Sequence, residues 1–164
     1  MALIVEDGTG LATAESYVSV ADADVRHTAL GNTAWTGTDA VKEAALRRAT
    51  QYMLQRYRTR WTGTRTFRVQ ALDWPRYGVE ADGYVVESDI VPDDVANACA
   101  DLALRALAED LNPDLERGVI RDKVGPLETE YDRFSPQSKR RTAVDQALAA
   151  YLRGNAANAV LIRA

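Results

Sequence analysis

Residues 92–111, PDDVANACADLALRALAEDL, have the clearest structural period in this sequence. Pro92 suits the first turn of a helix, and Asp93 and Asp94 place negative charge where the helix dipole favours it. Apolar residues then recur at helical spacing, which predicts an amphipathic helix. Its apolar face comprises Val95, Cys99, Leu102, Ala103, Ala106, Leu107 and Leu111, and its polar face comprises Asn97, Asp101, Arg105 and Glu109.

Three further helices are predicted around this stretch, over residues 19–31, over residues 38–57, and from a cap at Thr142 or Ser135 to Gly154. Ser19 is the expected cap of the first helix, with Asp22 in the reciprocal position. The apolar faces comprise Val20, Ala23, His27 and Leu30 in the first helix, Val41, Ala45, Ala49, Tyr52 and Met53 in the second, and Val144, Ala147, Leu148, Tyr151 and Leu152 in the last.

Strand patterns are short and lie between or beside the helices. Residues 119–132 predict a hairpin around Gly125-Pro126, which is a candidate exposed arm or partner-binding edge. Residues 3–5 and 84–86 predict two further short strands. The predicted fold class is therefore mainly α, a small four-helix bundle with a β-hairpin and short peripheral strands.

The length of 164 residues fits a single domain, which we place at residues 1–154. Residues 155–164 form a separate C-terminal segment in this interpretation. Its apolar end, Val160-Leu161-Ile162, has strand character. Such a segment either docks on its own sheet or adds to the sheet edge of a partner, which makes residues 155–164 a predicted docking tail.

Residues 47–77 concentrate the positive charge of the chain. Eight arginines against the single acid Asp73 give this segment a net charge of +7, so the remainder carries −11 to reach the overall −4. Six aromatic residues lie among the arginines. We expect Trp74, which precedes Pro75, to lie in the core and Arg76 to point outward. The candidate partner-binding or DNA-binding residues are Arg56, Arg58, Arg60, Trp61, Arg65, Arg68 and Arg76.

Three interpretations of this arginine-rich segment remain open. Guanidinium groups bind phosphates and aromatic rings stack on bases, as a single-stranded nucleic acid requires. Arginine and aromatic residues are also enriched at protein interfaces, where an acidic partner fits the charge equally well. The third interpretation is a solvated helix face followed by a loop whose rings belong to the core. Of the three, the protein interface is the favoured one.

The sequence lacks the residue patterns of common catalytic sites. Its one histidine, His27, and its one cysteine, Cys99, lie on apolar helix faces and are expected to pack in the core. No Ser-His-Asp arrangement, phosphate-binding glycine loop or calcium-binding spacing is present. We therefore expect no enzymatic activity, no cofactor and no metal. The N-terminus has no signal-peptide pattern and no apolar run is long enough to cross a bilayer, so we expect synthesis in the cytoplasm and no membrane contact.

Several short motifs stand in a characteristic order along nearly the whole chain. They are Ser16-Tyr17-Val18-Ser19, Gly31-Asn32 followed by Trp35, Gln70 with Leu72, Trp74-Pro75-Arg76, Ile90-Val91-Pro92 and Lys123-Val124-Gly125-Pro126. In this order they resemble the head–tail connector, or adaptor, family of tailed bacteriophages and prophages. Similar sequences are often labelled DnaT-like single-stranded-DNA-binding proteins. The dense arginines between Arg56 and Arg68 depart from a typical member of the family.

The resemblance implies a structural adaptor at the head–tail junction of the virion. Such a protein forms a homo-oligomeric ring beneath the portal protein, binds a tail-proximal connector or stopper protein, and surrounds the genome DNA in its lumen. It also implies that the tail with Val160, Leu161 and Ile162 docks on the portal. The family supplies no catalytic residues. The alternative is a single-stranded-DNA-binding replication accessory protein, against which the overall negative charge counts.

Overall fold

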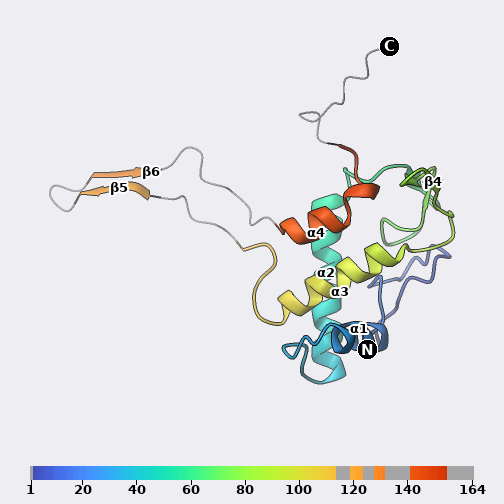
Figure 1. Ribbon diagram of the computed structural model, residues 1–164, viewed down its shortest axis with the longest axis horizontal. Coiled ribbons are helices and arrows are strands. Elements are labelled where there is room, and N and C mark those ends of the chain that lie inside the picture. Colours follow the sequence, from blue (N-terminus) through green and yellow to red (C-terminus); the bar gives the residue numbers. More distant parts are fainter. Residues whose placement is uncertain (1, 114–118, 124–127, 132–140, 155–164) are drawn as a thin grey trace, which may run out of the picture.

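The computed structural model describes residues 2–113, 119–123, 128–131 and 141–154. This part of the chain contains four α-helices, one 3-10 helix and three antiparallel pairs of strands (Figure 1). The helices are α1 (Val20–Ala29), α2 (Asp39–Tyr57), α3 (Asp93–Ala106) and α4 (Thr142–Ala147), followed by the 3-10 helix η1 (Ala149–Tyr151). The strands are β1 (Thr64–Arg65), β2 (Arg76–Tyr77), β3 (Glu80–Ala81), β4 (Tyr84–Val85), β5 (Val119–Lys123) and β6 (Glu128–Tyr131).

The four predicted helices are confirmed, most with bounds close to those expected. Ser19 caps α1, since its Oγ accepts a hydrogen bond from the backbone N–H of Asp22 at 3.0 Å. Thr38 precedes α2, but its side chain makes no capping hydrogen bond. Helix α4 is the shortest, because the chain changes to the 3-10 helix η1 after it. No helix in the described ranges is both long enough and apolar enough to span a membrane.

The core lies where α2 and α3 pack against each other. Figure 1 shows α3 crossing α2, with α1 near one end of α2 and α4 near the other. Leu46 and Met53 of α2 and Leu102 of α3 are fully buried in this region. The predicted core positions His27 and Cys99 are buried as well, so both predictions are confirmed.

The segment between α2 and α3 adds a row of aromatic rings to this core. The ring of Trp61 lies 5.7 Å from those of both Tyr57 and Trp74, measured between centroids. Trp74 in turn lies 5.6 Å from Tyr151 of η1. All four rings are buried, which confirms the core position predicted for Trp74. Aromatic side chains from irregular backbone thus link the end of α2 to the C-terminal elements.

The predicted fold class is wrong, because the molecule is a mixed α/β structure and not a four-helix bundle. Helices α2 and α3 are the longest of the described chain, and α1 and α4 are too short to line a bundle along the length of α2. Irregular backbone and short strands fill the missing volume with Trp61, Trp74 and Val79. A bundle requires helices that all contribute a continuous apolar stripe, and that condition is not met here.

The strands form separate two-stranded pairs. β1 pairs with β2 and β3 pairs with β4, which confirms a strand near residues 84–86. Residues 3–5 contribute only an isolated bridge between Val5 and Ser16. β5 and β6 form the predicted hairpin in antiparallel register, and they contact no other described helix or strand. The turn Gly125-Pro126 of this hairpin lies outside the described residues.

Candidate functional site

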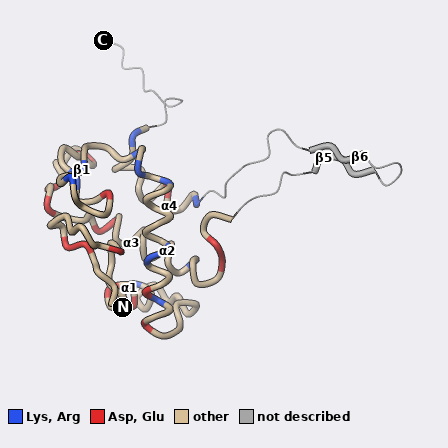
Figure 2. The backbone as a smooth tube through the Cα atoms, turned by 180° about the vertical axis from the view of Figure 1, so that it is seen from behind, with Lys and Arg blue, Asp and Glu red and all other residues tan. Residues whose placement is uncertain are grey.

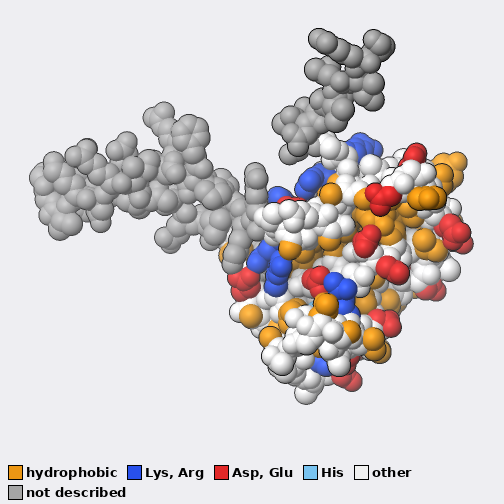
Figure 3. Space-filling model, viewed as in Figure 1, with side chains coloured by type: hydrophobic (Ala, Val, Ile, Leu, Met, Phe, Trp, Pro, Cys, Tyr) orange, Lys and Arg blue, Asp and Glu red, His pale blue; other side chains and the backbone are white. Residues whose placement is uncertain are grey.

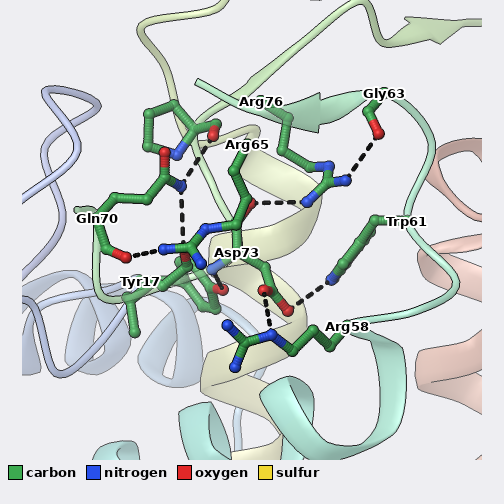
Figure 4. A network of polar contacts seen from close by, with 10 residues as sticks. Tyr17, Arg58, Trp61, Gly63, Arg65, Gln70, Asp73 and Arg76 are labelled. Carbon is green, nitrogen blue, oxygen red and sulfur yellow. Dashed lines mark hydrogen bonds and ion pairs between the residues drawn. The ribbon is translucent and has the colours of Figure 1, made fainter. Parts of the chain in front are cut away.

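Asp73 is the centre of a polar network in the arginine-rich segment (Figure 4). Its side chain is 1% exposed, and Trp61 Nε1 donates a hydrogen bond to its Oδ2 at 3.2 Å. Arg58 Nε lies 3.7 Å from the other carboxylate oxygen. Burial raises the pKa of Asp73, and the neighbouring arginines, Arg58 first, oppose that shift. The only acid of the segment is therefore held inside the fold by residues predicted to bind a partner.

Arg76 also belongs to this network, and the prediction that it points outward is wrong. The residue is 6% exposed. Its guanidinium donates hydrogen bonds to three backbone carbonyl oxygens, those of Thr62 at 2.8 Å, Gly63 at 2.9 Å and Asp73 at 3.1 Å. These carbonyls lie in irregular backbone, and a planar guanidinium satisfies several of them at once.

Arg65 and Gln70 hold the intervening loop. Arg65 Nη2 donates to the carbonyl oxygen of Gln70. The Gln70 side chain donates to the carbonyl oxygens of Leu72 and Pro75, and it accepts a hydrogen bond from the backbone N–H of Phe67. Three of the seven candidate binding residues, Trp61, Arg65 and Arg76, therefore stabilise the loop from within.

Three further arginines of the segment lie where α2 ends, and Arg153 from the C-terminal part of the described chain lies beside them. We name Arg56, Arg58, Arg60 and Arg153 the basic end. Arg56 and Arg60 each lie 3.7 Å from a carboxylate oxygen of Asp145. The backbone N–H of Arg153 donates to the carbonyl oxygen of Arg60 at 2.7 Å, which places Arg153 beside the end of α2. In Figure 2, blue segments lie beside α4 and on the chain that leads to the C-terminus.

The basic end keeps much of its charge available. Arg58 has a side chain that is 56% exposed, and Figure 4 shows its terminal nitrogens pointing away from Asp73. Arg153 is exposed and forms no ion pair with a described residue. Asp145 is the shared acid of Arg56 and Arg60, and its Oδ1 also accepts a hydrogen bond from the hydroxyl of Tyr57 at 2.9 Å.

Arg68 lies apart from both groups on an exposed loop. Its neighbours Phe67 and Val69 are exposed too, although the Phe67 ring lies against Gly10. The Arg68 side chain forms no ion pair within the described ranges. The predicted docking residues Val160, Leu161 and Ile162 lie outside the described residues.

A second surface was missed by the sequence predictions. Tyr77, Tyr84 and Val85 are largely exposed on β2 and β4. Figure 3 shows hydrophobic side chains beside acidic ones around the position of β4. We name Tyr77, Tyr84 and Val85, with the carboxylates of Glu80, Asp82, Glu87 and Asp89, the acidic tyrosine face. One signal was available, since no Lys or Arg occurs between Tyr77 and Leu104.

The one histidine and the one cysteine of the chain both have hydrogen-bonding partners inside the fold. His27 Nε2 donates to the carbonyl oxygen of Ala100 at 3.1 Å, and Asn32 Nδ2 donates to His27 Nδ1 at 3.1 Å. Cys99 Sγ lies 3.3 Å from Thr50 Oγ1. Among the described residues, no group of three or more His, Cys, Asp or Glu side chains is arranged to hold a metal ion.

Comparison with known proteins assigns the chain to a family. A family model described as "Putative DnaT-like ssDNA binding protein" matches residues 1–164. No curated protein and no solved structure matches the chain. Because the match covers the whole sequence, this chain belongs to the DnaT-like ssDNA-binding family.

Proposed function

We propose that this protein binds single-stranded DNA through its basic end. The family description supports this class of ligand. The observation that carries the proposal is the gathering of Arg56, Arg58, Arg60 and Arg153 at one end of the molecule, where Asp145 pairs with Arg56 and Arg60 alone among the described residues. A polyanion gains most from such a site, because each phosphate contact also releases counterions.

The ion pairs at the basic end suit exchange with phosphate. Both contacts to Asp145 are 3.7 Å long, and they lie partly exposed. Partly exposed pairs of this length contribute little stability, so a phosphate oxygen can replace the carboxylate at small cost. Trp61 is buried and the ring of Phe67 lies apart against Gly10, so the basic end binds the phosphates of the strand and leaves its bases free.

The test is a titration of fluorescently labelled oligothymidine, followed by anisotropy at several salt concentrations. We expect the double variant Arg60→Gln, Arg153→Gln to lose about tenfold or more in affinity at low salt. We also expect its slope of log K against log salt to be shallower by about 1.4, about 0.7 for each phosphate contact on a single strand.

Arg48→Gln is the matched control. Arg48 is an exposed arginine of α2, away from the C-terminal end of this helix, where the basic end lies. It should bind oligothymidine as the wild type does, and thermal melting should show that all variants are folded. An equal loss in the control and the double variant, or no binding by the wild type at low salt, would refute the proposal.

A second candidate function is a structural adaptor at the head–tail junction of a tailed phage. The observation that favours it is the β5–β6 hairpin, which contacts no other described helix or strand and so suits docking on a neighbouring protein. In this function the protein forms a ring, residues 155–164 bind the portal protein, a stopper protein binds the opposite side, and genome DNA passes through the lumen.

Quantitative mass spectrometry of purified particles separates the two candidates. A copy number fixed relative to the portal protein supports the adaptor and the virion location. Absence from particles, with the protein found only in infected cells, contradicts the adaptor and leaves DNA binding as the function.

A further inference from the structure

The acidic tyrosine face exposes three large apolar side chains, those of Tyr77, Tyr84 and Val85. Tyr84 is 79% exposed and Val85 is 80% exposed, although both lie in a strand. Val85 lines a groove of about 480 Å³ together with Tyr77, Val86 and Glu87. Contiguous exposed aromatic and aliphatic residues with a polar rim are typical of a protein-binding surface.

The charge of this face specifies the chemistry of its partner. Glu80, Asp82, Glu87 and Asp89 are its carboxylates, and none of them forms an ion pair with a described residue. No Lys or Arg occurs in the sequence from Tyr77 to Leu104. Nucleic acid is therefore repelled from this face, whereas a polypeptide surface rich in arginine is attracted.

The protein itself carries an arginine surface of the required kind. At the basic end, the guanidinium of Arg60 lies 5.7 Å from the ring centroid of Tyr57 and 3.7 Å from Asp145. One arginine can thus stack on a tyrosine and pair with a carboxylate at the same time. The acidic tyrosine face offers this combination of groups with no arginine in place.

We propose that the acidic tyrosine face binds the basic end of a second copy of this chain, with Arg153 of one copy paired to Glu87 of the other. The two surfaces adjoin at Tyr151, which lines a groove together with Val85 and Glu87 and lies two residues before Arg153. Two complementary surfaces that adjoin on one molecule form the same contact twice in a two-fold dimer. This inference does not depend on DNA binding.

Sedimentation velocity of the full chain without DNA tests the dimer. We expect association that strengthens with concentration at low salt and falls at least tenfold at high salt, since exposed charge pairs are screened. Val85→Ser should weaken it at least tenfold. Val25→Ser is the matched control, because Val25 is also largely exposed, at 71%, but lies on α1.

A charge exchange tests the pairing itself. Arg153→Glu and Glu87→Arg should each abolish association alone, because like charges then face each other. An equimolar mixture of the two variants should restore it, since opposite charges meet again in the mixed dimer. A wild type that stays monomeric, a control that fails like Val85→Ser, or a mixture that stays monomeric would each overturn the proposal. Glu87→Arg keeps the basic end, so its binding of oligothymidine reports separately on the proposed function.

Discussion

Arg76 satisfies three backbone carbonyls that no regular strand or helix reaches. We expect Arg76→Lys to lower the free energy of unfolding by about 2 to 4 kcal/mol, because a lysine ammonium cannot meet all three acceptors and buried acceptors lose their donors. Urea denaturation followed by tryptophan fluorescence measures this change.

Arg68→Lys is the control for that experiment. Arg68 is exposed and forms no ion pair within the described ranges, so the free energy of unfolding should change by less than about 0.5 kcal/mol. Similar stability of the two variants would contradict the structural role of Arg76.

His27 links stability to pH. Burial lowers the pKa of its imidazole below the usual value of 6.5, with the hydrogen bond to Ala100 in opposition. The unfolded chain therefore binds the proton more readily than the folded one. The His27 contribution to stability is complete above pH 6.5 and is lost as the pH falls from 6.5 through the folded pKa, at up to about 1.4 kcal/mol per pH unit.

The variant His27→Gln isolates this effect, since His27 is the one histidine of the chain. The difference in unfolding free energy between wild type and variant should shrink as the pH falls from 7.5 to about 5.5. A difference that is constant over this range would show that His27 does not titrate on unfolding.

Individual residues were predictable where a local pattern determines their environment. Ser19 as a cap and Cys99 as a core residue follow from neighbours within one or two helical turns. The inward direction of Arg76 depends on carbonyl groups at positions 62 and 63, more than ten residues away in sequence. The sequence does not distinguish an arginine that donates hydrogen bonds to buried carbonyls from one that binds a ligand.

At the scale of elements, the β1–β2 pair depends on a close approach of two backbones. Gly63 has a φ of 63°, and a Cβ there would lie 2.4 Å from the carbonyl oxygen of Tyr77. Gly78 has a φ of 70°, but nothing lies within 4 Å of its Cβ position. The two glycines thus share a left-handed backbone and differ in available space.

We expect Gly78→Ala to cost about 1 to 2 kcal/mol of stability from the left-handed backbone alone. Gly63→Ala should cost at least about 2 kcal/mol more, because the strand backbones must also separate. Chemical denaturation of the two variants side by side measures the difference. Equal losses would mean that the β1–β2 contact is dispensable.

The helices were predictable because apolar residues recur at helical spacing within each of them. Strands β1 to β3 could not be predicted from the sequence. Each has only two residues, and its strand conformation depends on pairing with another segment. The region from Arg58 to Phe67 shows no period, because Trp61 enters the core while Arg65 turns to a carbonyl oxygen. Tertiary contacts determine the conformation of such a segment, and scales of secondary-structure propensity do not include these contacts.

At the scale of the whole molecule, the sequence predicted four helices but not how they share the core. Trp61 and Trp74 lie outside the helices and are buried in the core. Their rings fill volume that long helices would fill in a four-helix bundle. The charge pattern was more informative. The arginines of residues 47–77 indicate a binding surface, and the cation-free stretch after Arg76 carries the acidic tyrosine face.

The absence of cations over this stretch also determines how the molecule is cut. Trypsin has no site between Arg76 and Arg105, so it releases the acidic tyrosine face and almost all of α3 as one peptide that begins at Tyr77. The lysines of the chain are Lys42, Lys123 and Lys139, and amine-reactive cross-linkers therefore leave this face untouched. A glutamate-specific protease divides it after Glu80 and Glu87, and carboxyl-reactive reagents label it directly.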